Sequence, residues 1–131
     1  MILFQNVSLQ YEADAGIHDI NFQVNPSEFA FLIGPTGAGK STILKLIYME
    51  LFPDSGTVEI LKYSSKKIKK RKIPFLRRKV GMIFQDYRLL KDRNIFENIA
   101  LPLHVMGYGR QEVYERVNNV IIDVGLNGKE K

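Results

Sequence analysis

The sequence contains no cysteine, so neither a disulfide nor a thiolate metal site can form. No second His, Asp or Glu stands at metal-ligand spacing from His18 or His104, and we expect no metal role for either histidine. The chain also lacks any hydrophobic run near the roughly 18 residues that a membrane span needs. The N-terminal stretch MILFQNVSLQYEAD has no basic start and no long apolar core, so we predict no signal peptide. Any membrane association should therefore be peripheral or through a partner.

Acidic residues are absent from one stretch, 62–79, which holds ten of the chain's 19 lysine and arginine residues. The other nine basic residues stand against 14 acidic ones, a balance of −5, so the net charge of +5 comes from this stretch alone. A basic run is ordinarily a solvated loop. It also suits contact with anionic lipid or with nucleic acid. Its only aromatic residues are Tyr63 and Phe75, and no base-stacking platform is evident.

The N-terminal part of the chain predicts β-structure. ILFQNVSLQY and GIHDINFQV mix apolar and polar residues with partial alternation, which is typical of half-buried antiparallel strands, and EADAG between them is turn-like. FAFLI, residues 29–33, is apolar throughout and predicts a strand buried on both faces, as in a parallel sheet. A helix should follow from about Gly39. Its expected apolar stripe consists of Ile43, Leu44, Leu46, Ile47 and Leu51.

The rest of the chain alternates between strand and helix patterns. TVEIL (57–61) and VGMIF (80–84) predict strands, and a short helix is expected around FLRRK, with Pro74 near its start. NIFENIAL predicts a helix that Asn94 caps together with Glu97, and Pro102 should limit it. The last helix is expected over 110–124, with glycine directly after it. Its predicted buried stripe is Val113, Val117, Val120, Ile121 and Val124, followed by Gly125.

Residues 34–41, GPTGAGKS, match the pattern G-x-x-x-x-G-K-[ST] at every fixed position, between a predicted strand and a predicted helix. Glycines let the backbone fold so that successive N–H groups form one concave site for phosphate oxygens. The helix start adds its free N–H groups and the positive end of its dipole. Lys40 can reach the β- and γ-phosphates, and the Ser41 hydroxyl can bind Mg²⁺.

The alternative to a phosphate site is a glycine-rich turn with a solvated lysine, which does not require the full pattern. We therefore predict nucleotide binding, although the loop alone does not separate a kinase, a GTPase, a motor or a transporter ATPase. The predicted cofactor-binding residues of the loop are Gly34, Pro35, Thr36, Gly37, Ala38, Gly39, Lys40, Ser41 and Thr42.

Further motifs narrow the class of nucleotide-binding protein. Tyr11 lies in the first hairpin, Gln85 ends VGMIF, and PDSGTVEI follows the first helix. Together they resemble the ATP-binding subunit of ABC transporters. The run IPFLRRKVGMIFQDYRLLKDRNIFENIALPLHVMG is most similar to the FtsE-like, cell-division branch of that family, which usually has Thr at the position of Asn94. The alternatives are ATPases of lipoprotein-releasing or macrolide-export type, or a binding module for lipid or nucleic acid with an idle loop.

The resemblance implies roles for individual residues. Tyr11 would stack on adenine, where the alternative is an ordinary strand aromatic. Gln85 would contact Mg²⁺ or the attacking water; the alternative is a polar residue that closes a strand. The resemblance thus implies that Gln85 and Lys40 are the catalytic candidates. It implies that Ser41 and Gln85 are the metal ligands. The helix after Gln85 would receive a membrane subunit in an apolar groove or simply pack in the core. The groove candidates are Ile95, Phe96 and Ile99.

The resemblance also implies an assembly. It predicts a protein peripheral on the cytoplasmic face of the cell membrane, coupling ATP and Mg²⁺ to an FtsX-like integral membrane subunit. The intact protein would form a homodimer around two ATP molecules. Anionic lipid is a possible further partner through 62–79, and nucleic acid is disfavoured.

Several family elements do not occur in the sequence: the LSGGQ-type signature, the acidic strand end, the catalytic glutamate and the switch histidine. We therefore expect the N-terminal part of a P-loop α/β domain of ABC type, with an antiparallel region (1–27), a P-loop core with a partial parallel sheet (28–85), and the Q-loop with the start of a helical subdomain (86–131). The isolated chain should bind Mg-nucleotide weakly and hydrolyse it negligibly. FAFLI should lack a neighbouring strand and favour association between chains.

Overall fold

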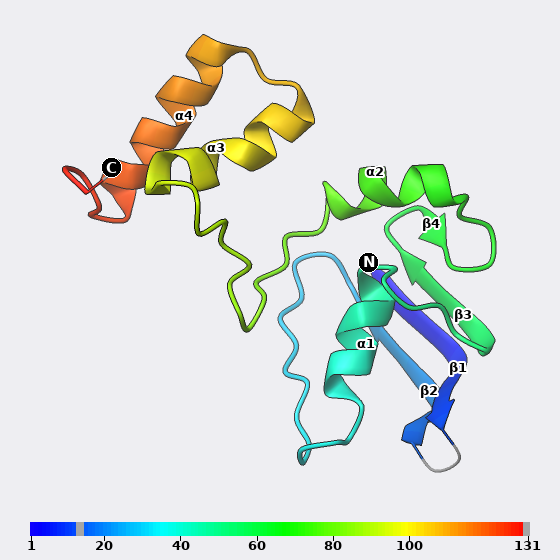
Figure 1. Cartoon of the computed structure of the whole chain (residues 1–131). Helices are drawn as coiled ribbons and strands as arrows, with labels where there is room; N and C mark the ends of the chain where they lie inside the picture. Colours follow the sequence, from blue (N-terminus) through cyan, green and yellow to red (C-terminus); the bar gives the residue numbers. More distant parts are fainter. Residues whose placement is uncertain (13–14, 130–131) are drawn as a thin grey trace. The chain divides into compact units, whose positions relative to one another are not determined.

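The computed structural model describes residues 1–12 and 15–129 and divides into two compact units, 1–82 and 83–131. The first unit contains a four-stranded sheet in the order β2-β1-β3-β4 (Figure 1). Its strands are β1 (Ile2–Glu12), β2 (Ala15–Val24), β3 (Ser55–Ile60) and β4 (Tyr63–Ser64), and every pairing is antiparallel. The two predicted N-terminal strands are thus confirmed, and the predicted turn lies partly outside the described residues.

A β-bulge explains why alternation in β1 is only partial. Phe4, Val7 and Leu9 are all buried, yet Val7 follows Phe4 by three positions and Leu9 follows Val7 by two. The register with β2 shifts between Phe4 and Val7, where Asn6 has a positive φ of 50°. The extra residue returns the following side chains to the core face.

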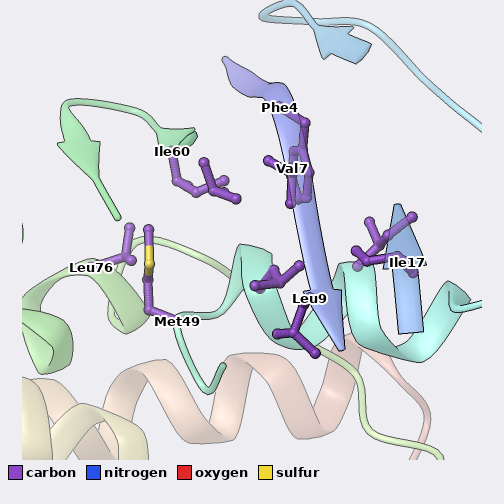
Figure 2. Packing of buried hydrophobic residues seen from close by; sticks show 10 residues of the cluster. Phe4, Val7, Leu9, Ile17, Met49, Ile60 and Leu76 are labelled. Atoms are coloured by element: carbon purple, nitrogen blue, oxygen red, sulfur yellow. The ribbon is translucent and has the colours of Figure 1, made fainter. Parts of the chain in front are cut away.

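Three helices accompany the sheet: α1 (Lys40–Ile47), the 3-10 turn η1 (Lys70–Lys72) and α2 (Ile73–Arg77). Figure 2 shows side chains from the strands and the helices meeting in one apolar core. Leu46 of α1 and Leu76 of α2 are fully buried there, and burying a side chain of this size stabilises a fold by about 1.5–3 kcal/mol. Leu44 of the predicted stripe is exposed, and the buried Thr42 takes a place on that face instead.

The guanidinium of Arg77 connects α2 to the end of α1. It donates hydrogen bonds to the carbonyl oxygens of Tyr48 and Met49, each 3.1 Å long, and lies 4.7 Å from the Tyr48 ring centroid. Carbonyl groups at a helix C-terminus have no partner within the helix, and a cation is favourable at that end. Arg77 therefore closes α1 and anchors the short helix that carries it.

Two predicted strands are corrected by the structure. Residues 29–33 and 80–84 form no strand, and Phe29, Phe31 and Ile33 are 80–86% exposed. An extended segment needs a neighbour for its backbone N–H and C=O groups, and no strand in the described part of the chain pairs with either segment. The prediction of a strand buried on both faces at FAFLI is therefore wrong.

The second unit is built on α3 (Ile95–Met106) and α4 (Arg110–Asp123). The predicted capping box is present: Asn94 Oδ1 accepts from the Glu97 N–H at 2.9 Å, and Glu97 Oε2 accepts from the Asn94 N–H at 3.2 Å. Pro102 does not end α3, which continues to Met106 and stops at Gly107 with φ 88°. Glycine there reaches the left-handed backbone that completes a helix end. No helix in the described residues is long and apolar enough to cross a membrane.

The core of the second unit joins Ala100 of α3 to one stripe of α4, made of Val113, Val117 and Ile121. Val120 and Val124, which the sequence pattern placed in this stripe, are exposed. Gly125 follows α4 with φ 70°, as predicted, and the Leu126 N–H donates to the Ile121 carbonyl. This hydrogen bond returns the chain onto the helix end.

Candidate nucleotide-binding site

Glycine backbone geometry shapes the entry to α1. Gly37 and Gly39 have φ angles of 86° and 87°, and Gly39 is the N-cap of α1. A Cβ atom at Gly39 would lie 2.3 Å from Cγ2 of the buried Ile17, whereas one at Gly37 would contact nothing within 4 Å. Gly39 is therefore required both for its conformation and for the close approach of the loop to β2.

The loop and the first turn of α1 enclose a small pocket of about 250 Å³. Its lining residues are Thr36, Gly37, Gly39, Lys40, Ser41 and Thr42. Within residues 1–12 and 15–129, no hydrogen-bond partner is found for the N–H groups of Gly37, Gly39 or Ser41. Free amides at a helix N-terminus attract anions, because the N–H dipoles and the helix dipole point the same way. The donor set fits a phosphate group.

Lys40 folds back over the loop that precedes it. Its Nζ donates to the carbonyl oxygens of Gly34 at 2.8 Å and Pro35 at 2.7 Å. The ammonium group is thus held beside the pocket by two neutral acceptors, and a negatively charged phosphate oxygen is a stronger partner than either. The next residue, Ser41, is exposed, so its hydroxyl is available for a ligand.

Tyr11 lies beside this pocket. Its hydroxyl is 3.1 Å from Oγ1 of Thr42, in the first turn of α1, and its side chain is half exposed. The sequence predicted a role for both residues but could not place them in contact, because 31 positions separate them. The tertiary fold therefore brings an exposed aromatic ring to the edge of the phosphate-type loop.

Gln85 lies in the other compact unit, in an irregular segment where its side chain is exposed. The residues after it form a tight turn with positive φ angles at Tyr87 and Arg88. The Arg88 guanidinium lies 3.8 Å from the Phe84 ring centroid and 3.7 Å from the Asp86 carboxylate. The proposed role of Gln85 at the loop 34–42 stays a prediction.

Asn98 is a residue that sequence reasoning missed. Its Oδ1 accepts from the Leu90 N–H at 2.8 Å, and its Nδ2 donates to the carbonyl oxygens of Leu90, Arg93 and Asn94 at 2.9–3.1 Å. One amide thus holds the segment after Gln85 against the first turn of α3. No local pattern signals this role, since an asparagine in a first helical turn is ordinarily a solvent-facing polar residue.

The described residues contain no group of three or more His, Cys, Asp or Glu that could hold a metal ion. His18 and His104 are both exposed.

Comparison with known proteins gives concordant matches. The family model described as ABC transporter matches residues 17–131. Three proteins named cell division ATP-binding protein FtsE are similar to this chain. The protein from Streptococcus pneumoniae D39 is 38% identical over 98% of this chain and 56% of its own length, and that from Mycobacterium tuberculosis is 39% identical over 98% of this chain and 57% of its own length. The protein from Escherichia coli K12 is 41% identical over 100% of this chain and 60% of its own length. The chain thus spans less than two thirds of the length of these relatives.

Solved structures of an ATP-binding cassette show the same fold. A dimeric post-hydrolysis state of the cassette MJ0796 bound to ADP and Pi matches with a TM-score of 0.85 and 26% identity, covering 99% of this chain and 60% of that one. A dimeric structure described as MJ0796, a bacterial ABC transporter cassette, matches with a TM-score of 0.87 and 27% identity over the same shares. The fold expected from the sequence, a P-loop α/β domain of ABC type, is confirmed by these matches.

Proposed function

Because the chain belongs to the ABC transporter family, we propose that residues 34–42 bind the phosphates of ATP and that the intact protein is an ABC-type ATPase. The observation that carries this proposal is the set of free amides at the start of α1, closed on one side by Lys40. The backbone N–H groups of Gly37, Gly39 and Ser41 would donate hydrogen bonds to phosphate oxygens. The Lys40 ammonium would exchange its two carbonyl partners for the β- and γ-phosphates.

Ser41 and Gln85 are proposed to hold Mg²⁺. A hydroxyl and an amide oxygen are ligand types that this ion accepts, and Ser41 lies in the lining of the pocket. Bound with the nucleotide, Mg²⁺ neutralises phosphate charge. Gln85 would also orient the attacking water.

Tyr11 is proposed to stack on the adenine ring. The contact between its hydroxyl and Thr42 holds the aromatic ring at the end of the loop, and half of its side chain remains open to a ligand. Stacking of a base on an aromatic side chain contributes about 1–3 kcal/mol. The hydroxyl contact orients the ring and need not itself touch the nucleotide.

For the whole protein, we propose an FtsE-like subunit that dimerises around two ATP molecules. It would couple their binding and hydrolysis to an FtsX-like membrane partner in cell division, from the cytoplasmic face of the membrane. Support comes from the names of the relatives at 38–41% identity and from the dimeric state of the cassettes with the same fold.

The test is a titration of the full-length protein with Mg-ATP. We expect saturable binding that falls by about 10- to 100-fold in Lys40→Ala, because a charge-assisted hydrogen bond contributes roughly 1.5–3 kcal/mol. Lys45→Ala is the matched control: Lys45 is an exposed lysine of the same helix that does not line the pocket. The absence of saturable binding, or equal affinity in Lys40→Ala and the unaltered protein, would refute the phosphate site.

A further inference from the structure

The second feature of the first unit is a basic surface that the nucleotide site does not use. We call the ten lysine and arginine residues of 62–79 the basic patch. All of them are exposed except Arg77, which is half-buried. Its members are Lys62, Lys66, Lys67, Lys69, Lys70, Arg71, Lys72, Arg77, Arg78 and Lys79.

The positive charge of the patch is not neutralised by neighbouring carboxylates. In the described residues, the ion pairs found join Arg88 to Asp86, Arg93 to Asp92 and Arg116 to Glu112. None involves the basic patch. The rest of the chain carries a net −5, so the two signs of charge are segregated along the sequence. An unpaired cluster of this density attracts a polyanionic surface.

The patch is held on a folded support. Leu76 buries its whole side chain in the core beneath α2, and Arg77 is bound to the two carbonyl oxygens at the end of α1. The cations of η1 and α2 are therefore displayed from an ordered surface. Such a surface presents several cations at once without the full cost of ordering a disordered tail.

An exposed aromatic ring stands among these cations. Phe75 is 47% exposed, with Lys72 Nζ 5.1 Å and Arg78 Cζ 5.2 Å from its ring centroid. The combination of an exposed phenylalanine with surrounding lysine and arginine is the composition that binds at the boundary of lipid headgroups and acyl chains. A purely solvated charge run does not need the phenylalanine.

We propose that the basic patch binds the surface of a bilayer containing anionic phospholipid, with the Phe75 ring entering the headgroup boundary. Lipid is favoured over nucleic acid because Phe75 is the one exposed aromatic of this stretch. Single-stranded nucleic acid instead needs several aromatic rings for successive bases. The proposal goes beyond nucleotide binding and does not depend on it.

The test uses sedimentation of the full-length protein with phosphatidylcholine vesicles, with or without 30 mol% phosphatidylglycerol (about the anionic content that gives a strong surface potential). The patch variant carries Lys66→Gln, Lys67→Gln, Lys69→Gln and Lys70→Gln. Each cation near an anionic surface contributes about fivefold to binding, the equivalent of about 1 kcal/mol. We therefore expect binding to anionic vesicles to fall on the order of a hundredfold or more.

A control variant removes four exposed cations outside the patch, with the same change of net charge: Lys45→Gln, Lys91→Gln, Arg110→Gln and Lys129→Gln. It should keep most of the binding. Equal loss in both variants would mean that net charge alone is responsible and would overturn the proposal. Equal binding of the unaltered protein to neutral and anionic vesicles would overturn it as well.

Phe75→Trp supplies a direct readout, because none of the 131 residues is a tryptophan and the emission of the unaltered protein can be subtracted. After the emission of the unaltered protein is subtracted, the tryptophan emission maximum should move to shorter wavelength when anionic vesicles are added. It should not move in their absence. An unshifted emission under conditions of full sedimentation would refute entry of the ring.

If the unaltered protein bound duplex or single-stranded DNA more tightly than vesicles, the ligand of the basic patch would be nucleic acid and the lipid proposal would be wrong. The patch variant should bind Mg-ATP with the affinity of the unaltered protein. A negative result for lipid binding would therefore not contradict the proposed nucleotide site.

Discussion

The hydroxyl oxygen of Tyr11 lies 3.1 Å from Oγ1 of Thr42. This contact joins the end of β1 to the first turn of α1. It also places an exposed aromatic ring beside the amides that we propose as phosphate ligands. Thr42 is buried, so packing around its side chain holds the helix residue of this contact in place.

Two substitutions of Tyr11 separate the ring from its hydroxyl. Tyr11→Phe keeps the ring and should change Mg-ATP affinity by less than about threefold, whereas Tyr11→Ala should weaken it by about 5- to 100-fold, the range of base stacking on an aromatic side chain. Equilibrium titration of the full-length protein measures both. If Tyr11→Ala binds as the unaltered protein does, Tyr11 is an ordinary strand aromatic.

Gly39 and Gly37 form a matched pair, because both have nearly the same positive φ and only Gly39 has a close neighbour. Gly37→Ala should lower the free energy of unfolding by about 1–2 kcal/mol, the cost of a left-handed backbone. Gly39→Ala should cost about 1–3 kcal/mol more, because its Cβ meets Ile17. Chemical denaturation measures the difference.

The contact with Ile17 can be checked in a second background. When Ile17→Ala has removed the Cγ2 atom, the cost of Gly39→Ala should fall to that of Gly37→Ala. A double-mutant cycle isolates this coupling. Equal costs of Gly39→Ala with and without Ile17 would show that the close approach has no energetic effect.

Asn98→Ala should destabilise the second unit by about 1–3 kcal/mol, because it leaves the Leu90 N–H and carbonyl without their side-chain partner. Asn119→Ala, on the exposed surface of α4, is the control and should be nearly neutral. Hydrogen exchange of the Leu90 amide gives a local readout and should accelerate only in Asn98→Ala. Unchanged exchange would contradict the role of Asn98.

Asp19 should make stability depend on acidic pH. Hydrogen bonds from Asn6 and then from Asn21 lower the pKa of its carboxyl group below the ordinary 3.8. A lowered pKa in the folded state means that this stabilisation is present above the unfolded pKa and is lost as pH falls through the folded pKa. In Asp19→Asn the decline of unfolding free energy at pH below about 4 should be shallower. A curve parallel to that of the unaltered protein would contradict this.

The exposed segment 29–33 should promote association of the 131-residue chain. Phe31 is 80% exposed, and Phe29 stacks edge-on against it with ring centroids 4.8 Å apart. Phe31→Ser should reduce light scattering at a given concentration, because it removes apolar surface from an unpaired segment. Ile122→Ser, at an exposed site of α4, should have a smaller effect. Similar scattering by both variants would exclude a special role of the segment.

Helical features were predictable from short stretches. The capping box of Asn94 and Glu97, the start of α1 at the loop, and Gly125 after α4 all agree with the sequence patterns. Pro102 is the exception. Its ring was expected to end the helix, yet α3 continues to Met106. Packing of the helix against α4 in one apolar core supports the turn that follows the proline.

The sequence by itself determined the glycine loop, the helix ends and the local concentration of positive charge, because each depends on residues a few positions apart. Only the tertiary structure decided that Tyr11 meets Thr42, that Arg77 closes α1, and that 29–33 is exposed and forms no strand. The physical reason lies in where hydrogen bonds go. A helix satisfies its backbone within one segment, whereas a strand or a side-chain bridge depends on a partner that neighbouring residues do not specify.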